Sequence, residues 1–537
     1  MRMSKTLRAV AAALGLTTAC VAWLVEPLVE PTHNQIYHWD AGTWVLFGPV
    51  ALDIAIVWVV ATLLLLSAER PGRWRVAVWA AILICLPWIL VKNLRIAWPN
   101  VLPHGFQLPQ FIFAVVAWAL VVLLWRRSFS RRSDVVIEFG STVLAFVAIS
   151  GALFLTQFTW VWWQARSLND PLPLHQKRVV AAADDPHPRI IWIVLDELSY
   201  QQVYEHRYPG LELPAFDALA ADATVFTHVR PAGKYTEKIL PGLMTGQRVD
   251  DLRSSASGQL SIHGADTGKW QRFDEHNSVF QDALNDGYET AVVGWFNPYC
   301  RMLAAVLNSC YCSYSDQTGN GLNPDGTFES NMFVAATPVI GKGSAPLLVW
   351  RLLHLPEERG SILAGRLKDY RKLSAAADRV LQDKSADFAL LHLPIPHPFG
   401  IYDRATGQLT THPTTYIDNL ALADRYVAHV RSLLEQSGQW DSSTVIIMGD
   451  HGWRTTLLWE HMSYWTPEEE RASDGGKFDD RPGYIVKLAG QKSGNRIDLP
   501  FRAVETRALM DALMAGKIRS PEDLQAWVKQ SVQNYNH

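Results

Sequence analysis

The chain has 537 residues, a formal net charge of −3, and 49% hydrophobic against 19% charged residues. This length argues against one ordinary domain, and the small negative charge gives no reason to expect a nucleic-acid partner. Apolar residues and tryptophans concentrate in the first third, while the remainder has an ordinary mixture of charges. We therefore expect a membrane unit followed by a polar unit.

Five apolar runs in the first third each approach the roughly 20 residues that a membrane-spanning helix needs. They lie near 7–28, 45–67, 74–92, 108–125 and 135–161. Arginine and lysine residues precede the first run and separate the second from the third and the fourth from the fifth. Because positive flanks favour the cytoplasm, we expect a cytoplasmic N-terminus and an extracytoplasmic chain after Trp163. Asp53, inside the second run, is a functional candidate, although we favour a carboxyl group hydrogen-bonded within the bundle.

The expected domains are a transmembrane bundle at 1–163, a polar linker at 164–188 and an extracytoplasmic catalytic domain at 189–537. Three of the five cysteines cluster in the last of these regions. In an oxidising compartment, Cys300 can form one disulfide with either Cys310 or Cys312.

Continuous apolar runs of strand length recur in the polar unit, and amphipathic helical segments alternate with them. The clearest runs lie at 189–196, 387–393, 443–448 and 484–488, and the clearest helix lies at 416–435. This alternation predicts an α/β sandwich with a largely parallel sheet. Residues 301–375 show no strong pattern, and we make no prediction for them.

Two acids, Asp196 and Glu197, end the first of these runs. Ligands of open parallel sheets bind beyond the carboxyl ends of the strands, where acids are well placed to bind a metal. A helix cap is the alternative for an acid at this point.

The stretch 231–246 reads PAGKYTEKILPGLMTG and places Thr236 at the start of a predicted helix. The amide groups and dipole at such a helix start suit a phosphate or a similar anion. A threonine here can equally be a structural helix cap.

Histidines and an acid follow the later strands, at His397, at Asp450 and His451 within GDHG, and at His461. Each has a structural explanation when taken alone. If the strand ends meet at one sheet edge, their carboxylate, imidazole and hydroxyl groups together suit a divalent ion. We expect zinc first, with manganese as the alternative.

These motifs, in this order, resemble the alkaline phosphatase superfamily and its sulfatase-like branch. The resemblance rests on the paired acids 196–197, the segment LPAFDALAADATVFTH at 213–228, the spacing from Thr236 to Gly246, and GDHG at 449–452. Sulfatases need cysteine or serine where this chain has Thr236, and they carry proline and arginine just after it. Pro241 instead has a spacing similar to that of membrane phosphoethanolamine transferases. Those enzymes and lipoteichoic acid synthases have a threonine nucleophile and five spans before an external catalytic domain.

The resemblance implies that Thr236 is both nucleophile and metal ligand. Asp196 or Glu197 would complete the metal site together with Asp450 and His451. His397 and His461 would contact the phosphate or a second metal.

Two further roles and a set of partners are expected. Lys234 or Lys238 can hold phosphate oxygens, unless both are solvated surface charges. His397 or His461 can protonate the leaving alcohol. The expected partners are a glycerophospholipid donor and an envelope glycan or lipid acceptor.

We therefore expect an enzyme of the bacterial cytoplasmic membrane that transfers phosphoethanolamine or phosphoglycerol through phosphorylated Thr236. One alternative is a membrane-bound phosphodiesterase or sulfatase-like hydrolase. The other is a non-catalytic lipid-binding protein, which predicts that the metal residues are lost.

Overall fold

The computed structural model describes residues 4–29, 43–97, 116–118, 120, 133–168, 170, 172–176, 187–255, 257–315, 327–332, 358–460, 462 and 465–535. These residues divide into two compact units. The first contains the described residues up to 168 together with 327–332, and the second contains 170–315 and the described residues from 358 onward. Of the predicted linker at 164–188, residues 169, 171 and 177–186 lie outside the described residues.

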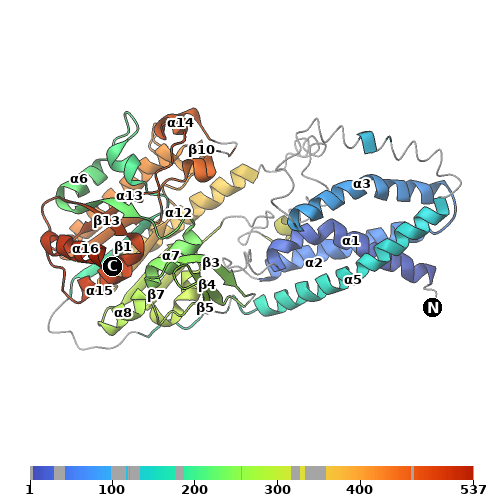
Figure 1. The fold of residues 1–537 in the computed structure, drawn as a ribbon, viewed down its shortest axis with the longest axis horizontal. Coiled ribbons are helices and arrows are strands. Elements are labelled where there is room, and N and C mark those ends of the chain that lie inside the picture. The colour runs from blue at the N-terminus through green and yellow to red at the C-terminus, as the bar shows by residue number, and fades with distance from the viewer. Residues whose placement is uncertain are drawn as a thin grey trace. The chain divides into compact units, whose positions relative to one another are not determined.

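The first unit consists of long helices (Figure 1). They are α1 (Lys5–Val29), α2 (Thr43–Ser67), α3 (Arg73–Ala97) and α5 (Ser133–Ala165). Two of the described helices, α2 and the stretch Asp134–Ala165 of α5, are long and apolar enough to cross a membrane. Helices α1 and α3 cover the first and third predicted spans but do not meet that criterion, and α3 carries basic residues near both ends. The predicted span at 108–125 lies largely outside the described residues, so five spans remain a prediction.

Small residues let the helices of this unit approach closely. Ala9, Ala12 and Ala13 of α1 are buried in the cluster that joins it to α2, α3 and α5. A Cβ atom at Gly15 would lie 2.0 Å from the carbonyl oxygen of Leu144 on α5. Close packing of this kind replaces the hydrophobic driving force that apolar surroundings do not supply.

The second unit is built on an eight-stranded sheet in the order β13-β2-β12-β11-β1-β8-β6-β7. Its strands are β1 (Arg189–Leu195), β2 (Thr224–Arg230), β6 (Thr290–Trp295), β7 (Ser309–Ser313), β8 (Phe388–Leu393), β11 (Ser443–Gly449), β12 (Tyr484–Lys487) and β13 (Asn495–Arg502). Strand β12 runs antiparallel to both of its neighbours, and the other pairings are parallel. The prediction of a largely parallel α/β sheet is confirmed.

Helices cover both faces of this sheet (Figure 1). They are α6 (Pro214–Asp222), α7 (Thr236–Thr245), α8 (Val279–Asn285), α9 (Tyr299–Met302), α12 (Glu358–Gln382), α13 (Tyr416–Gln436), α14 (Pro467–Ala472), α15 (Thr506–Met514) and α16 (Pro521–Tyr535). Alternate residues of β1 enter two cores: Ile193 packs with α6, α12 and α13, and Trp192 packs with α7, α8 and α15. Burial on both faces explains why the central strands read as continuous apolar runs.

The register of the sheet brings the chemically active stretches together. Leu195 at the end of β1 pairs with Gly449 of β11 and with Leu393 of β8. The residues that follow these three strands therefore leave the sheet at the same edge, as the sequence predicts.

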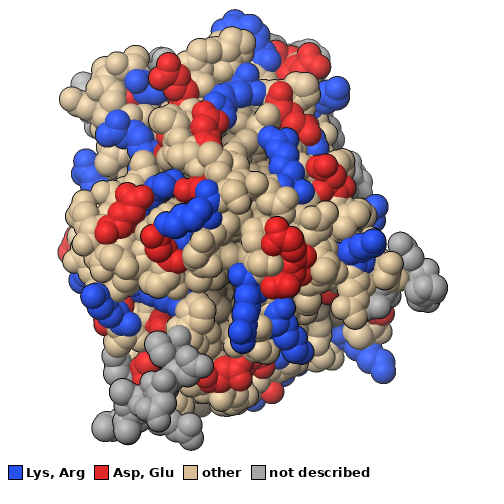
Figure 2. Space-filling model, turned by 90° about the vertical axis from the view of Figure 1, so that its left-hand side faces the viewer, with Lys and Arg blue, Asp and Glu red and all other residues tan. Residues whose placement is uncertain are grey.

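Several smaller elements were not predicted. They include the sheet of β3 (Val249–Ser254), β4 (Leu260–Gly264) and β5 (Lys269–Arg272) and the pair β9 (Gly400–Asp403) and β10 (Gln408–Thr414). Strands β7 and β13 and the long helix α12 were not predicted either. On the face of the molecule drawn in Figure 2, basic and acidic side chains are interspersed over the described surface.

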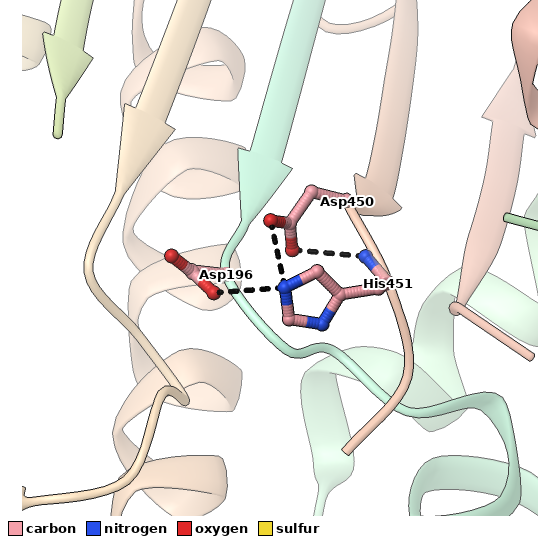
Figure 3. A group of neighbouring side chains, drawn as sticks. All are labelled: Asp196, Asp450 and His451. Carbon is pink, nitrogen blue, oxygen red and sulfur yellow. Dashed lines mark hydrogen bonds and ion pairs between the residues drawn. The ribbon is translucent and has the colours of Figure 1, made fainter. Parts of the chain in front are cut away.

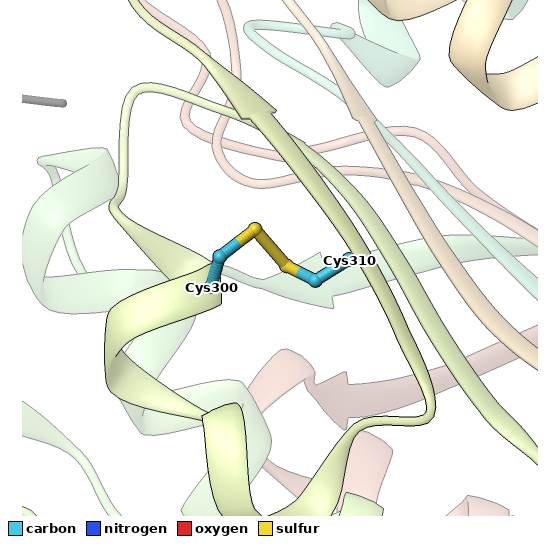
Figure 4. Close-up of a disulfide and its surroundings, with 2 residues drawn as sticks. All are labelled: Cys300 and Cys310. Carbon is cyan, nitrogen blue, oxygen red and sulfur yellow. A yellow bond between two sulfur atoms is a disulfide. The ribbon is translucent and has the colours of Figure 1, made fainter. Parts of the chain in front are cut away.

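A disulfide joins Cys300 of α9 to Cys310 of β7 (Figure 4). It settles the predicted alternative in favour of Cys310, and Cys312 is not part of the bond.

Candidate metal and nucleophile site

Thr236 is the first residue of α7, but it is not the helix cap. The N-cap is Tyr235, in an extended conformation, and the helix ends at Gly246 in the left-handed conformation. The buried Thr236 hydroxyl instead donates a 2.7 Å hydrogen bond to Oδ2 of Asp450. The helix start is confirmed, and the capping role is replaced by a contact with an acid 214 residues away.

Asp450 lies at the centre of the site. Its Oδ1 accepts hydrogen bonds from the backbone amides of Glu197, at 3.0 Å, and His451, at 2.9 Å. Although burial would raise the pKa of Asp450, the nearby His451 and His392 and the hydrogen bond from Thr236 hold it below its usual value. Asp450 is therefore a carboxylate that accepts from the Thr236 hydroxyl.

Asp196, at the end of the neighbouring strand β1, and His451, the residue after Asp450, lie close to the Asp450 carboxylate (Figure 3). Nε2 of His451 lies 3.2 Å from Oδ2 of Asp450 and 3.9 Å from Oδ1 of Asp196. On the other side of the ring, Nδ1 lies 3.0 Å from the carbonyl oxygen of Gly452, which can only accept, so Nδ1 carries the proton. Burial keeps the pKa of His451 below its usual value, so a nitrogen lone pair points at two carboxyl groups.

This arrangement fits a divalent ion. Within the described residues, both side-chain oxygens of Asp196 and Nε2 of His451 are buried without a hydrogen-bond partner. Burial and repulsion from Asp450 raise the pKa of Asp196 well above its usual value. A cation would remove this conflict, because Asp196, Asp450 and His451 offer ligand atoms within 4.8 Å of one another.

The glycines of GDHG allow the close backbone packing around these ligands. A Cβ atom at Gly449 would lie 2.5 Å from the Leu198 carbonyl oxygen, and one at Gly452 would lie 2.6 Å from the Asp479 carbonyl oxygen. Larger residues would displace the strand end that carries Asp450 and His451.

Glu197 points to a different set of partners. Its backbone adopts a positive φ of 65°, which is uncommon for a residue other than glycine. Nε of Arg454 donates to Oε1 of Glu197 at 2.7 Å, and Nε1 of Trp459 lies 2.9 Å from both of its carboxylate oxygens. Glu197 is therefore paired with Arg454, whereas both carboxyl oxygens of Asp196 are without a hydrogen-bond partner within the described residues.

His397 lies between two buried arginines. Its Nδ1 lies 2.5 Å from Nη1 of Arg366 and 2.7 Å from the Pro398 carbonyl oxygen. Its Nε2 lies 3.3 Å from Nη2 of Arg454 and 3.8 Å from Oε1 of Glu197. Burial, followed by the charges of Arg366 and Arg454, lowers the pKa of His397 well below its usual value. The imidazole is neutral at physiological pH.

The remaining predicted residues lie elsewhere or are not described. The Lys238 ammonium donates to the Asp250 carbonyl oxygen at 2.7 Å and pairs with Asp251, both on β3. Lys234 is exposed, and His461 lies outside the described residues. The structure thus brings Thr236, Asp196, Asp450 and His451 together, with Glu197 and His397 beside them.

Sequence reasoning missed Arg454 and Arg366. Arg454 lies four residues after Asp450, and its Nη1 donates at 3.4 Å to the carbonyl oxygen of Lys234, just before the helix that starts with Thr236. The GDHGWR stretch offered a signal, because a buried acid such as Glu197 needs a cationic partner. Arg366 lies on α12, in the region without a predicted pattern.

A hollow of about 380 Å³ opens beside this edge of the sheet and is lined by Gln201, Lys477, Phe478, Asp479, Asp480 and Arg481. Strand β12 is antiparallel to β11, so the residues that lead into it lie at the edge where β1 and β11 end. A hydrogen bond of 3.2 Å from the Gly452 amide to the Asp480 carbonyl oxygen joins the two regions.

The sequence also matches a known protein family. The Sulfatase family model matches residues 188–471, which is more than half of the chain. No curated protein matches the chain in sequence.

Solved structures that resemble the chain include Ps i-CgsB in complex with k-i-k-neocarrahexaose, at 16% identity, 63% coverage of this chain, 74% of that chain and a TM-score of 0.39. The phosphonate monoester hydrolase of Agrobacterium radiobacter has 13% identity, coverages of 61% and 74%, and a TM-score of 0.36. The lipoteichoic acid synthase LtaP from Listeria monocytogenes has 13% identity, coverages of 65% and 78%, and a TM-score of 0.36.

Proposed function

Because the chain belongs to the Sulfatase family of hydrolases and phosphoryl transferases, we propose that it transfers a phospholipid head group through a covalent intermediate on Thr236. The head group is phosphoethanolamine or phosphoglycerol, and the acceptor is an envelope glycan or lipid. The observation that carries this proposal is the Thr236 hydroxyl at a helix start, bonded to Asp450 beside the unpartnered atoms of Asp196 and His451.

In the first half-reaction, Oγ1 of Thr236 attacks the phosphorus of the donor, and the bond from phosphorus to the diacylglycerol oxygen breaks. The proton lost by the threonine hydroxyl ends on the diacylglycerol oxygen, which leaves as an alcohol. The hydrogen bond to Asp450 orients the hydroxyl for this attack. In the second half-reaction an acceptor hydroxyl attacks the same phosphorus, and the bond from phosphorus to Thr236 breaks. The proton of the acceptor hydroxyl ends on Oγ1 of Thr236, which restores the threonine hydroxyl.

A divalent ion held by Asp196, Asp450, His451 and Thr236 would lower the pKa of the threonine hydroxyl and offset phosphate charge. The oxygen-rich ligand set with one imidazole suits zinc or manganese. Arg454 supplies a fixed positive charge beside the residues that precede Thr236. The neutral His397 has one acceptor nitrogen, so it can accept from Arg454 at Nε2 while Nδ1 donates to the Pro398 carbonyl oxygen, or from Arg366 at Nδ1.

Membrane anchoring is the part of the proposal that selects a lipid donor. Helices α2 and α5 meet the length and apolarity of a span, and they expose large apolar side chains. These include Val59 and Leu63 of α2 and Phe139, Phe146 and Leu153 of α5. Such surfaces suit lipid rather than water. We propose five spans, a cytoplasmic N-terminus and a catalytic domain outside the bacterial cytoplasmic membrane.

The hollow beside the site supports an acceptor that carries hydroxyl groups. Asp479 and Arg481, two residues that line the hollow, pair with each other, and Arg481 also pairs with Glu205. Lys477 and Asp480 are exposed at its rim, where they can bind hydroxyl groups of a glycan.

The test is the mass of the peptide that contains Thr236, in full-length protein purified from its own membrane. We expect a mass increase that corresponds to phosphoethanolamine, phosphoglycerol or phosphate on that residue. Thr236→Ala should abolish the adduct, and Thr236→Ser should retain it. An active protein that shows no adduct under any trapping condition would refute the covalent mechanism.

Transfer and hydrolysis are separated by the fate of the head group. A strain that lacks the protein should lose one decoration from its surface glycans or lipids, detectable by mass spectrometry. Release of the free head group with unchanged surface glycans and lipids would favour the hydrolase.

A further inference from the structure

Asn331 belongs to the first unit, although its sequence position lies between β7 and α12 of the second. Residues 328–332 form a short helical turn, and the Asn331 side chain is completely buried. Its Nδ2 donates a 2.9 Å hydrogen bond to the backbone carbonyl oxygen of Val45 on α2.

The carbonyl of Val45 is available because of Pro49. In a regular helix this oxygen would accept from the amide of residue 49, four positions later. Proline has no amide hydrogen, and Pro49 lies inside α2. A buried carbonyl without a partner is costly, and Asn331 supplies the missing donor.

The same turn of α2 also receives an aromatic ring. Phe328 stacks on Trp44 with ring centroids 5.4 Å apart, and Trp44 in turn stacks on Trp162 of α5 at 5.8 Å. A Cβ atom at Gly48 would lie 2.7 Å from Cε2 of Phe328. Glycine at this position therefore leaves the space that the ring occupies.

We propose that Trp44, Val45, Gly48 and Pro49 form a notch on α2 that binds residues 327–332. The notch combines an unsatisfied carbonyl, a space without a side chain and an aromatic surface within little more than one helical turn. The segment 327–332 fits these three features. The Asn331 amide donates to the Val45 carbonyl oxygen, and the Phe328 ring lies against Gly48 and stacks on Trp44. The chain leaves the unit that contains the sheet after β7, binds to α2 and returns as α12, which carries the Arg366 that contacts His397.

This docking site lies within the helical unit and does not depend on which reaction the protein performs. Its test is amide hydrogen exchange of the peptide 327–332 in the full chain, purified in detergent. The Asn331 amide donates to the Thr327 carbonyl oxygen, so the peptide reports on this turn. We expect Asn331→Leu and Phe328→Ala each to accelerate exchange about tenfold, because each removes one of the docking contacts.

Pro49→Ala provides the decisive background. It restores the helical donor to Val45, so adding Asn331→Leu should then accelerate exchange only about twofold. Glu329→Gln is the matched control, because Glu329 is exposed on the same turn, and it should leave exchange unchanged. Unchanged exchange in Asn331→Leu and Phe328→Ala would overturn the docking site. Equal acceleration by Asn331→Leu in both backgrounds would overturn the role of Pro49.

Discussion

Arg454 and Glu197 form a buried ion pair in which Nε of the guanidinium donates to Oε1 of the carboxylate at 2.7 Å. The two side chains are 7% and 0% exposed, so neither charge is compensated by water. Glu197 belongs to a second group of possible ligands, with Asp196 and His397, and Arg454 lies against two members of that group. The Arg454 guanidinium thus supplies the positive charge that a second metal ion would otherwise have to supply to Glu197.

Arg454→Met should lower the melting temperature of the full chain, because it leaves the Glu197 carboxylate buried without a cation. Loss of one partner of a buried pair costs about 3–5 kcal/mol. The double variant Glu197→Gln with Arg454→Met should recover most of the loss. If the double variant is no more stable than the single one, the pair does not provide the compensation described above.

Metal content gives a second prediction from the same pair. We expect one divalent ion per chain by elemental analysis of purified protein, because Arg454 already neutralises Glu197. Two ions per chain in the unmodified protein would contradict this assignment.

Asp196→Asn should have opposite effects with and without metal. In metal-free protein it removes a carboxyl group whose two oxygens are buried without partners in the described structure, so the melting temperature should rise. In metal-loaded protein the same change removes a ligand, and affinity for the ion should fall by about 100-fold or more.

Asp369→Asn is the matched control for Asp196→Asn. Asp369 is equally buried but accepts hydrogen bonds from Ser313, Ser315 and Trp295. Its replacement should lower stability with or without metal. A metal-free Asp196→Asn protein that is also less stable would argue against a cation site.

Much of the fold was predictable because its central strands are buried on both faces. The runs that became β1, β8 and β11 are continuous and apolar, and each ends at the site-bearing edge. The family match confirms the resemblance to sulfatase-like proteins. The motifs identified Thr236, Asp450 and His451 because a strand end or helix start is visible in local sequence.

The different surroundings of Asp196 and Glu197 were not predictable in the same way, and which of them binds a metal stays a prediction. These surroundings depend on the positive φ at Glu197 and on Arg454, whose partner lies 257 residues away in sequence. Helix α12 was missed because its apolar residues are interrupted by many charges, so Arg366 was missed with it. Tertiary pairing of this kind leaves no local pattern.

His392 should make stability depend on pH in mildly acidic solution. It is fully buried, and Nδ1 lies 2.7 Å from the Tyr299 hydroxyl. Burial lowers its pKa from the usual 6.5 to about 4. Between these values the unfolded chain binds a proton that the folded chain does not, so stability is complete above pH 6.5 and is lost as the pH falls. The loss approaches about 3 kcal/mol near pH 4.

The measurement is the melting temperature of metal-free protein across this pH range. His392→Gln should flatten the dependence, whatever its effect on absolute stability, because glutamine does not titrate. An unchanged slope in His392→Gln would assign the dependence to other groups.

Reduction of the Cys300–Cys310 disulfide should destabilise the second unit. The bond closes a loop with a sequence separation of 10 residues, for which the chain-entropy estimate is about 3 kcal/mol. Cys310→Ser should therefore lower the melting temperature under oxidising conditions and remove its sensitivity to reductant. Cys312→Ser, two residues along the same strand, should leave both properties unchanged. Equal effects of the two substitutions would contradict the pairing and favour exchange between the two cysteines.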